Sequence, residues 1–232
     1  MAAVGGGAGT GVEADQARWH RLVDPRDRRD ADRLRSPVAR RRLVARRAAT
    51  RAVLAAALGT TAGDLVVERR CARCGSTEHG KPRVPDADLA FSVAASEEVV
   101  VIALAPDEVG VDLERRAGDP PVPAALAQPE RARLTELGPE QQADVFVDLW
   151  TAKEAVLKAD GAGLAGNPAL VDASDLVDRD RAELTFARRR WQVRRLGLPG
   201  GLGDRSLSVA SASSTSVAGV RVQMCDGPPG TR

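Results

Sequence analysis

Residues 91–105 constrain the fold most, because they contain two apolar runs rich in Val and Ala separated by one short polar segment. Strands favour β-branched side chains, and a polar break between two such runs favours a turn. We therefore expect Phe91–Ala105 to form two strands joined at Ser96-Glu97-Glu98. Val109–Glu114, which follows Pro106–Glu108, is expected to be a further strand.

Other segments show helical spacing of their apolar residues. The spacing predicts a helix over Val38–Leu58, started by Ser36-Pro37 and ended by Gly59. Further helices are expected at Ala124–Leu137 and Glu140–Ala159. Strands are also expected at Leu65–Glu68, Glu183–Phe186, Trp191–Arg195, Leu207–Ala210 and Val217–Val222. Because helices and strands occur in both halves, the pattern predicts an α+β protein.

The chain has 232 residues, enough for one large domain or two small ones. The Pro- and Gly-rich break Ala117–Pro123 is the best boundary between two halves. We expect a disordered lead-in over residues 1–16, an N-terminal half over 17–116, a C-terminal half over 117–226 and a short tail over 227–232.

Composition narrows the class of protein. No apolar run approaches the roughly 18 residues of a membrane span, and Met1–Gly11 lacks the basic start and apolar stretch of a signal peptide. We therefore expect a soluble, cytoplasmic protein without a membrane partner. In that compartment the three cysteines Cys71, Cys74 and Cys225 are expected to be reduced thiols.

Positive charge is concentrated near the N-terminus. Residues 18–51 contain thirteen Arg against four Asp, a local net charge of +9 in a chain whose total is +2. Such a stretch can be a solvated helix face or a face that binds phosphates. A nucleic-acid-binding protein is the alternative from another functional class, although acidic clusters elsewhere in the chain would repel a polyanion.

The cations of the chain are almost all arginine. Of 34 basic residues only Lys81, Lys153 and Lys158 are lysines. An arginine stays charged at any working pH, whereas a lysine changes its pKa readily on burial and can exchange a proton. A lysine in this chain is therefore a candidate for a position where arginine would not serve.

Gly110-Val111-Asp112-Leu113-Glu114 places two acidic side chains on one side of a strand. Carboxylates so placed repel one another unless a cation or proton intervenes, and oxygen ligands of this kind suit Mg²⁺ bridging to phosphates. The alternative is a solvated pair on an exposed strand face.

Trp150–Lys158 continues the helix that begins near Glu140. Spacing of four residues places Phe146, Trp150, Glu154 and Lys158 on one stripe, and Leu149, Lys153 and Leu157 on an adjoining stripe. A Glu and a Lys one turn apart are usually a surface ion pair. Two of the three lysines nevertheless stand within this segment, which favours a functional role.

Cys71-Ala72-Arg73-Cys74 followed by His79 has the C-x2-C-x4-H spacing that begins a zinc knuckle. A fourth ligand is missing at the expected place, where the chain has Val84. A structural zinc site usually has four protein ligands, so we favour a tight, reduced loop before Lys81.

The two acidic and lysine-bearing segments, in this order and separated by 35 residues, closely resemble the signature of the phosphopantetheinyl transferases. The second reads Trp150-x-x-Lys153-Glu154-Ala155-x-x-Lys158-x-x-Gly161-x-Gly163. The match is to the larger, surfactin-synthetase-activating type. Gly80-Lys81-Pro82 also looks like an element of that family, and Arg47 and Arg51 fall where its N-terminal helix presents cations to coenzyme A.

The resemblance implies a pseudo-dimer of two similar α+β halves and a cytoplasmic, monomeric enzyme of secondary-metabolite biosynthesis. It implies transfer of the phosphopantetheine arm of coenzyme A to a serine of an acyl or peptidyl carrier protein. The implied site residues are the catalytic Asp112, Glu154 and Lys158; the Mg²⁺ ligands Asp112, Glu114 and Glu154; and the coenzyme A contacts Arg47, Arg51, Lys81, Pro82, Ser96, Lys153 and Lys158.

One departure concerns coenzyme A. The family usually reads Asn-Leu-Ser-His-Ser, with the His on a phosphate, whereas this chain reads Ser92-Val93-Ala94-Ala95-Ser96. Losing one charge-assisted contact costs about 1.5–3 kcal/mol, which weakens binding without forbidding catalysis. A degenerate member that binds coenzyme A or a carrier protein without efficient transfer is the alternative that Ala95 raises.

Overall fold

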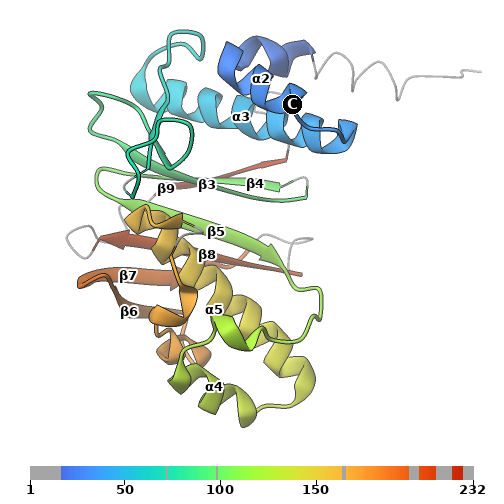
Figure 1. The fold of residues 1–232 in the computed structure, drawn as a ribbon, viewed down its shortest axis with the longest axis vertical. Coiled ribbons are helices and arrows are strands. Elements are labelled where there is room, and N and C mark those ends of the chain that lie inside the picture. Colours follow the sequence, from blue (N-terminus) through green and yellow to red (C-terminus); the bar gives the residue numbers. More distant parts are fainter. Residues whose placement is uncertain are drawn as a thin grey trace, which may run out of the picture. The chain divides into compact units, whose positions relative to one another are not determined.

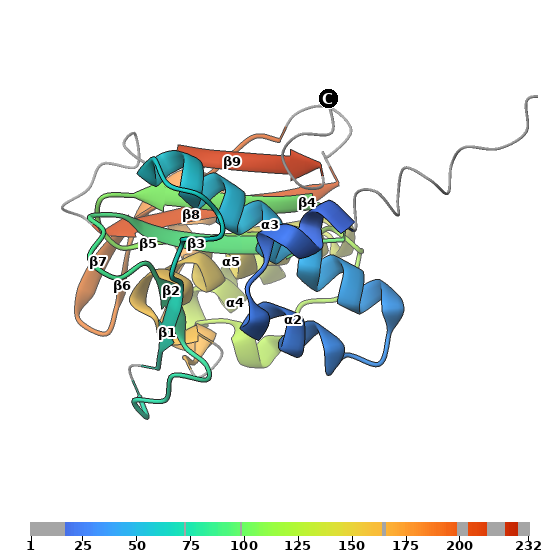
Figure 2. The same ribbon diagram turned by 90° about the horizontal axis from the view of Figure 1, so that it is seen from above.

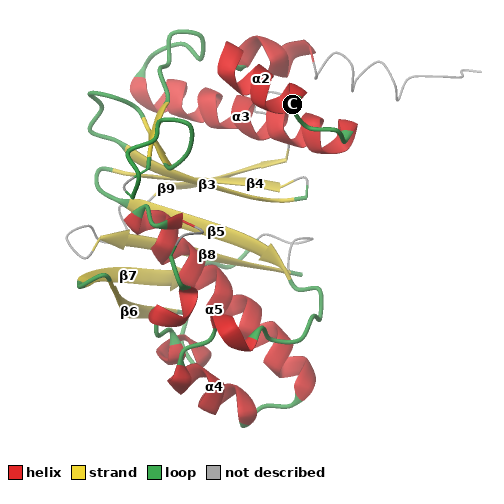
Figure 3. Cartoon of the chain, viewed as in Figure 1, coloured by secondary structure: helices red, strands yellow, loops and turns green. Residues whose placement is uncertain are grey.

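The structure is a computed structural model that describes residues 17–71, 73–97, 99–163, 166–198 and 204–212, and the backbone of 221–226. These residues divide into two compact units. The first contains the described parts of 1–65, 97–100 and 225–232, and the second contains those of 66–96 and 101–224. Helices and strands occur in separate runs along the described part of the chain: helices, then five strands, then further helices with short 3₁₀ turns, and then four strands (Figure 3), so the predicted α+β class is confirmed.

The first unit is built on two helices, α2 (Pro25–Asp32) and α3 (Pro37–Leu58), which lie side by side (Figure 2). Each begins with a proline after an N-cap side chain, because proline at the first helical position sacrifices no hydrogen bond. The N-cap of α3 is Ser36, and the helix ends at Gly59 in the left-handed conformation with φ 66°. The apolar contact between the helices consists of Val23, Ala31, Val44 and Ala48, with Trp19, Leu22 and Leu43 at its edge.

Two small sheets belong to the second unit, except for residues 99–100 and 225–226 at strand ends, which belong to the first unit. β1 (Glu68–Arg70) and β2 (Lys81–Arg83) form an antiparallel hairpin. β3 (Ala90–Ser96) and β4 (Val99–Ala105) are joined at Glu97, whose φ is 54°, and β4 also pairs with β9 (Arg221–Asp226). The predicted pair of strands within Phe91–Ala105 is confirmed.

The larger sheet has the order β5-β8-β7-β6, with β5 at one edge. Its strands are β5 (Val109–Arg115), β6 (Arg181–Phe186), β7 (Arg189–Arg195) and β8 (Arg205–Ala212). The neighbouring strands are antiparallel, and Asp112 lies opposite Ser208 in the β5–β8 register. This sheet supplies the surface on which the long C-terminal helix packs.

Helix α5 (Pro139–Asp160) crosses the sheet, with α4 (Gln128–Thr135) beside it (Figure 1). Short 3₁₀ turns cover Pro123–Ala125, Pro168–Leu170 and Ser174–Val177. Between helix and sheet lies an apolar cluster to which α5 contributes buried residues from Leu149 to Ala159. Its most buried members include Leu149, Ala152, Ala155, Val156, Leu157, Leu176, Trp191 and Val193.

Some predicted boundaries differ from the structure. The strand expected at Leu65–Glu68 is instead at Glu68–Arg70, because the carbonyl oxygen of Leu65 accepts a hydrogen bond from Arg51. β2 and α2 were not predicted. The strand expected at Val217–Val222 lies partly outside the described residues, where the structure has β9 at Arg221–Asp226.

The predicted helix Glu140–Ala159 is confirmed within one residue at each end. The helix expected at Ala124–Leu137 is shorter and follows a separate 3₁₀ turn. None of the helices in the described part of the chain is long and apolar enough to cross a membrane. The division at residue 116 and the likeness of the two halves stay predictions, and the expected lead-in and tail lie outside the described residues.

Candidate active site

The acidic strand and the lysine helix meet at a very close contact. A Cβ atom added to Gly110 of β5 would lie 1.9 Å from the carbonyl oxygen of Ala155 and 2.6 Å from the backbone nitrogen of Ala159. Only glycine fits between these atoms, since real Cβ atoms do not approach so closely. The contact brings Lys158 of α5 to the following residues of β5: its Nζ donates to Asp112 Oδ1 at 2.6 Å and to the Val111 carbonyl oxygen at 3.2 Å.

Lys158 acts electrostatically on three carboxylates, those of Asp112, Glu114 and Glu154. Burial raises the pKa of Asp112, and Lys158 acts against that shift. Burial also raises the pKa of Glu154 and of Glu114, and in both cases the charge of Asp112 adds to the effect. The site therefore holds three acidic groups in partial exclusion from water, with the ammonium group of Lys158 as the cation that acts on each of them.

The donor set fits a divalent cation. Asp112 Oδ2 is buried and has no hydrogen-bond partner among the described residues, which is costly for a carboxylate oxygen. Carboxylate oxygens are hard ligands of the kind that Mg²⁺ selects. The ligand atoms of Asp112, Glu114 and Glu154 do not all lie within 4.8 Å of one another, so a cation bound by all three would draw them together.

The two predicted stripes of α5 are both present. Phe146 and Trp150 pack with their ring centroids 6.2 Å apart, on the stripe that continues to Glu154 and Lys158. A side-chain hydrogen bond from Trp150 acts on Glu114 and opposes the rise of its pKa. The stripe thus leads from an aromatic contact directly to the acidic groups.

Lys153 lies away from these groups, on the adjoining stripe. Its side chain is 1% exposed, and its Nζ donates to the Ala125 carbonyl oxygen at 2.8 Å and to the carboxylate of Glu130. Glu130 also accepts hydrogen bonds from the backbone N–H groups of Ala127 and Ala173. Lys153 was predicted to contact coenzyme A, but in the structure its ammonium group joins α5 to α4 and to the 3₁₀ turn before α4.

Arg51 of the first unit is likewise used inside the protein. Its side chain is 4% exposed, and the guanidinium group donates to Asp24 and to the carbonyl oxygens of Ala62 and Leu65. Arg47 forms an ion pair with Asp27 at 3.2 Å, and burial lowers the pKa of its guanidinium group. Arg51 was predicted to contact a phosphate of coenzyme A. Its guanidinium N–H groups instead donate to partners inside the fold.

The remaining predicted coenzyme A contacts lie on the smaller strands. Lys81 of β2 is half-buried, and its Nζ donates to the Ala159 carbonyl oxygen near the end of α5. Burial lowers the pKa of Lys81. Pro82 pairs with Arg69 in the hairpin, and Ser96 is the last residue of β3. Their contact with coenzyme A stays a prediction.

Sequence reasoning missed the polar residues that position α5 on the sheet. The hydroxyl group of Thr151 lies 3.0 Å from that of Ser206 and 3.1 Å from that of Ser208, in a fully buried cluster. Ser206 and Ser208 lie opposite Glu114 and Asp112 in the β5–β8 register. No sequence signal marks these small residues, because their pairing depends on strands far apart in the chain.

The three potential soft ligands of the β1–β2 loop are brought together. One atom each of Cys71, Cys74 and His79 lies within 4.8 Å of the other two, and both cysteines are free thiols. Hydrogen bonds from the backbone of Cys74 and Arg73 lower the pKa of the Cys71 thiol. The reduced state of these two cysteines stays a prediction, and the side chain of Cys225 lies outside the described residues.

Comparison with known proteins identifies the region that carries this site. Residues 108–210, from the start of β5 to β8, match the family model of the 4'-phosphopantetheinyl transferase superfamily. The match includes Asp112, Glu114, Glu154 and Lys158. It does not include Arg47, Arg51, Lys81, Pro82 and Ser96.

Curated relatives agree with the family model. A 4'-phosphopantetheinyl transferase of Bacillus subtilis is 29% identical over 119 residues, 46% of this chain and 53% of that protein. The 4'-phosphopantetheinyl transferase Sfp of Bacillus subtilis (strain 168) is 30% identical over 99 residues, 40% of this chain and 43% of that protein. The 4'-phosphopantetheinyl transferase HetI of a Nostoc species is 31% identical over 144 residues, 58% of each chain.

The chain thus spans about half the length of the curated relatives it matches. The family-model match contains both motif segments and the carboxylate and lysine groups that they carry. Residues 108–210 are therefore similar to the 4'-phosphopantetheinyl transferase superfamily, and the chain resembles its larger, Sfp-like type.

Proposed function

We propose that this protein transfers the 4'-phosphopantetheine arm of coenzyme A to a serine of an apo acyl or peptidyl carrier protein, releasing adenosine 3',5'-bisphosphate. The observation that supports the proposal is the contact between Lys158 and Asp112, together with the electrostatic effect of Lys158 on Glu114 and Glu154, within the segment that matches the family. The reaction type is inferred from the relatives' names. The acidic groups form a site whose chemistry is compatible with that reaction.

Asp112, Glu114 and Glu154 would hold Mg²⁺ in the proposed site. The bound ion would neutralise negative charge on the pyrophosphate of coenzyme A. Asp112 is the central ligand of the proposal, because its buried Oδ2 has no partner in the described part of the chain while its Oδ1 accepts a hydrogen bond from Lys158.

The transfer itself exchanges a phosphoanhydride bond of coenzyme A for a phosphate ester bond to the carrier serine. The serine oxygen of the carrier protein bonds to the phosphorus next to the pantetheine arm, and the bond from that phosphorus to the bridging oxygen of adenosine bisphosphate breaks. Glu154, directly or through an oriented water, takes the serine proton. Lys158 donates a proton to the departing phosphate oxygen, a role that an amine can perform and a guanidinium cannot.

The proposed coenzyme A contacts are Lys81, Pro82, Ser96 and Arg47. Lys153 and Arg51 are left out of the set, because their charged groups already bind partners within the protein. We further propose that the protein acts as a cytoplasmic monomer in secondary-metabolite biosynthesis.

Intact-mass spectrometry of an apo carrier protein tests the proposal. The carrier is incubated with this protein, coenzyme A and Mg²⁺, and we expect its mass to increase by one phosphopantetheine group. Addition of EDTA should stop the reaction and excess Mg²⁺ should restore it. Carriers of both the acyl and the peptidyl type should be used.

Asp112→Asn is the decisive variant, because it keeps the size of the side chain and removes the charge. We expect no mass increase with this variant. Asp144→Asn is the matched control, since Asp144 stands on the same helix as Glu154 but its side chain is 60% exposed. An unmodified carrier with the wild-type protein would refute transfer, and coenzyme A binding without transfer would instead support a degenerate family member.

A further inference from the structure

The loop between β1 and β2 is closed and compact. Its ends are fixed by the pairing of Arg70 with Lys81. Within the loop, the N–H of Cys71 donates to the Ser76 carbonyl oxygen and the N–H of Gly75 donates to the Cys71 carbonyl oxygen, both at 2.9 Å. Gly75 has φ 71°, so the chain turns back after Cys74 in a conformation that glycine adopts without strain.

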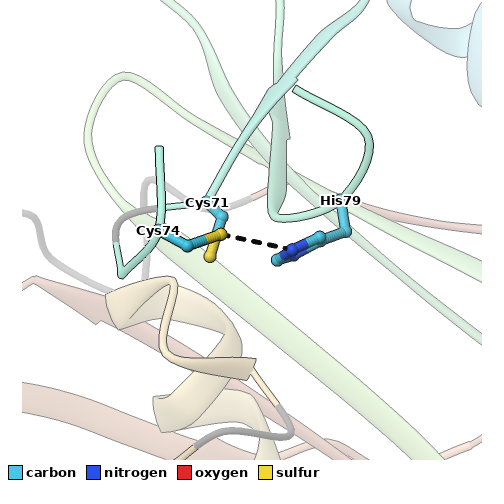
Figure 4. A group of neighbouring side chains, drawn as sticks. All are labelled: Cys71, Cys74 and His79. Carbon is cyan, nitrogen blue, oxygen red and sulfur yellow. Dashed lines mark hydrogen bonds between the residues drawn. The ribbon is translucent and has the colours of Figure 1, made fainter. Parts of the chain in front are cut away.

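Three side chains of this loop point toward one another (Figure 4). The sulfur atoms of Cys71 and Cys74 and a ring nitrogen of His79 all lie within 4.8 Å, and Cys74 Sγ is 3.4 Å from His79 Nε2. Tetrahedral zinc, with bonds of about 2.3 Å to sulfur and 2.0–2.1 Å to nitrogen, places its ligand atoms about 3.5–3.8 Å apart. The Cys74–His79 separation of 3.4 Å is close to this value, and the other two separations are no more than 4.8 Å.

We propose that Cys71, Cys74 and His79 bind one Zn²⁺, with a water molecule as the fourth ligand. Thiolate and imidazole groups are the ligand types that zinc prefers in proteins. Among the described His, Cys, Asp and Glu residues, no fourth member joins the group. Three protein ligands with one open position form a known type of zinc site, and here the exposed positions of Cys74 and His79 give water access to the ion.

The site would fix the strand that carries Lys81. The end of the loop approaches β1 closely: a Cβ added to Gly80 would lie 2.3 Å from the Arg70 carbonyl oxygen, and the φ of Gly80 is 111°. Lys81 follows directly and bonds to the carbonyl oxygen of Ala159 in α5. Zinc therefore joins the two ends of a loop that has little apolar core, beside a residue of the proposed coenzyme A contacts.

Metal content tests the proposal without any activity measurement. The full chain is purified under a phosphine reductant, loaded with Zn²⁺ and passed through a desalting column, and its zinc is then counted by elemental analysis. We expect about one zinc per chain, as for a single three-ligand site. Cys71→Ser, Cys74→Ser and His79→Ala should each lose most of this zinc.

Matched controls exist in the same chain. Cys225→Ser removes the remaining thiol and His20→Ala removes the other histidine, and both variants should keep the full zinc content. If the loop variants retain as much zinc as the wild type, or if the reduced wild-type protein retains none, the proposal is wrong. A Cys71–Cys74 disulfide that persists under the reductant would also overturn it.

Cobalt substitution identifies the ligands directly. Co²⁺ in a four-coordinate site with two thiolates gives a strong sulfur-to-metal charge-transfer band and visible bands of tetrahedral intensity. We expect both in the wild type, with the charge-transfer band reduced by about half in each single cysteine variant that still binds Co²⁺, because one of two thiolates is removed. Weak bands of octahedral cobalt in the wild type would contradict the assignment.

Limited proteolysis tests whether the ion holds the loop. Arg73 stands between the two cysteines and is a site for trypsin. Removing zinc by chelation should increase cleavage after Arg73 several-fold, because the loop opens locally without unfolding the sheet. Equal cleavage with and without zinc would show that the ion does not constrain the loop.

Discussion

Lys158 Nζ lies 2.6 Å from Asp112 Oδ1, so the lysine helix and the acidic strand are joined by an ion pair at the centre of the proposed site. The lysine side chain is 29% exposed and the aspartate side chain only 7%. The pair therefore has a buried acidic end and a basic end that solvent and substrate can reach. This arrangement suits a lysine that exchanges a proton with a bound phosphate.

Two substitutions separate the charge of Lys158 from its proton. Lys158→Arg keeps a cation beside Asp112 but cannot donate a proton at neutral pH. We expect it to lower the transfer rate about 10²-fold or more, the usual size of a general acid contribution. Lys158→Met should lose at least as much. Full activity in the Arg variant, measured by carrier mass in timed samples, would show that charge alone is needed.

The close contact at Gly110 predicts a large effect from one methyl group. Gly110→Ala forces a Cβ into the backbone of α5, so we expect the free energy of unfolding to fall by about 3 kcal/mol, at the upper end of overpacking effects. Gly197→Ala is the control, because a Cβ there meets nothing within 4 Å. It should change the free energy of unfolding by less than about 0.5 kcal/mol. Equal denaturation midpoints for both variants would contradict the contact.

The buried ion pair of Lys153 and Glu130 predicts a structural role for that lysine. Lys153→Met leaves the Glu130 charge without its partner, and we expect a loss of about 3–5 kcal/mol in the free energy of unfolding. Adding Glu130→Gln to this variant should recover part of the loss, because the isolated charge is then removed. The pair of Arg133 and Asp178 is the surface control.

Both Arg133 and Asp178 are at least 40% exposed, so Arg133→Met should cost no more than about 1 kcal/mol. The measurement is urea denaturation of the four proteins at one pH. A Lys153→Met variant as stable as Arg133→Met would mean that the buried pair does not hold the helix.

Replacing Ala95 with histidine is expected to increase the affinity for coenzyme A. The position is exposed near the end of β3, so a histidine there could reach solvent without disturbing the core. If the family's usual phosphate contact is what this chain lacks, Ala95→His should tighten coenzyme A binding by about tenfold or more. Thr185→His, also at an exposed strand position, is the control. Calorimetric titration with coenzyme A, giving no change or weaker binding for Ala95→His, would show that other residues already fill the role.

The sequence was sufficient for the elements with long periodic patterns. Val109–Glu114 and Glu140–Ala159 were predicted nearly to the residue, because alternation and helical spacing depend on near neighbours. The strand β2 was missed, since three residues that include Pro82 carry no pattern. Helix α2 was missed although Asp24-Pro25 is a typical start, because its mostly charged sequence lacks an apolar stripe.

The site was predicted only where its chemistry is visible in residue types. Asp112 and Lys158 were selected by motif, and the structure joins them. Lys153 and Arg51 were selected by the same reasoning, yet both side chains are buried and bind partners that are distant in the sequence. Residue type alone does not show whether a cation is already paired inside the fold or available to a ligand. That distinction requires the packing.

The transfer reaction is tested most directly by counting both products of one reaction. Carrier protein, coenzyme A and Mg²⁺ are incubated with the wild type, Glu154→Gln or Asp144→Asn, and modified carrier and adenosine 3',5'-bisphosphate are quantified in the same samples. We predict equal amounts of the two products for the wild type and for Asp144→Asn, and neither product above background for Glu154→Gln. Unmodified carrier with the wild type, or equal rates for Glu154→Gln and the wild type, would contradict the proposed transferase site.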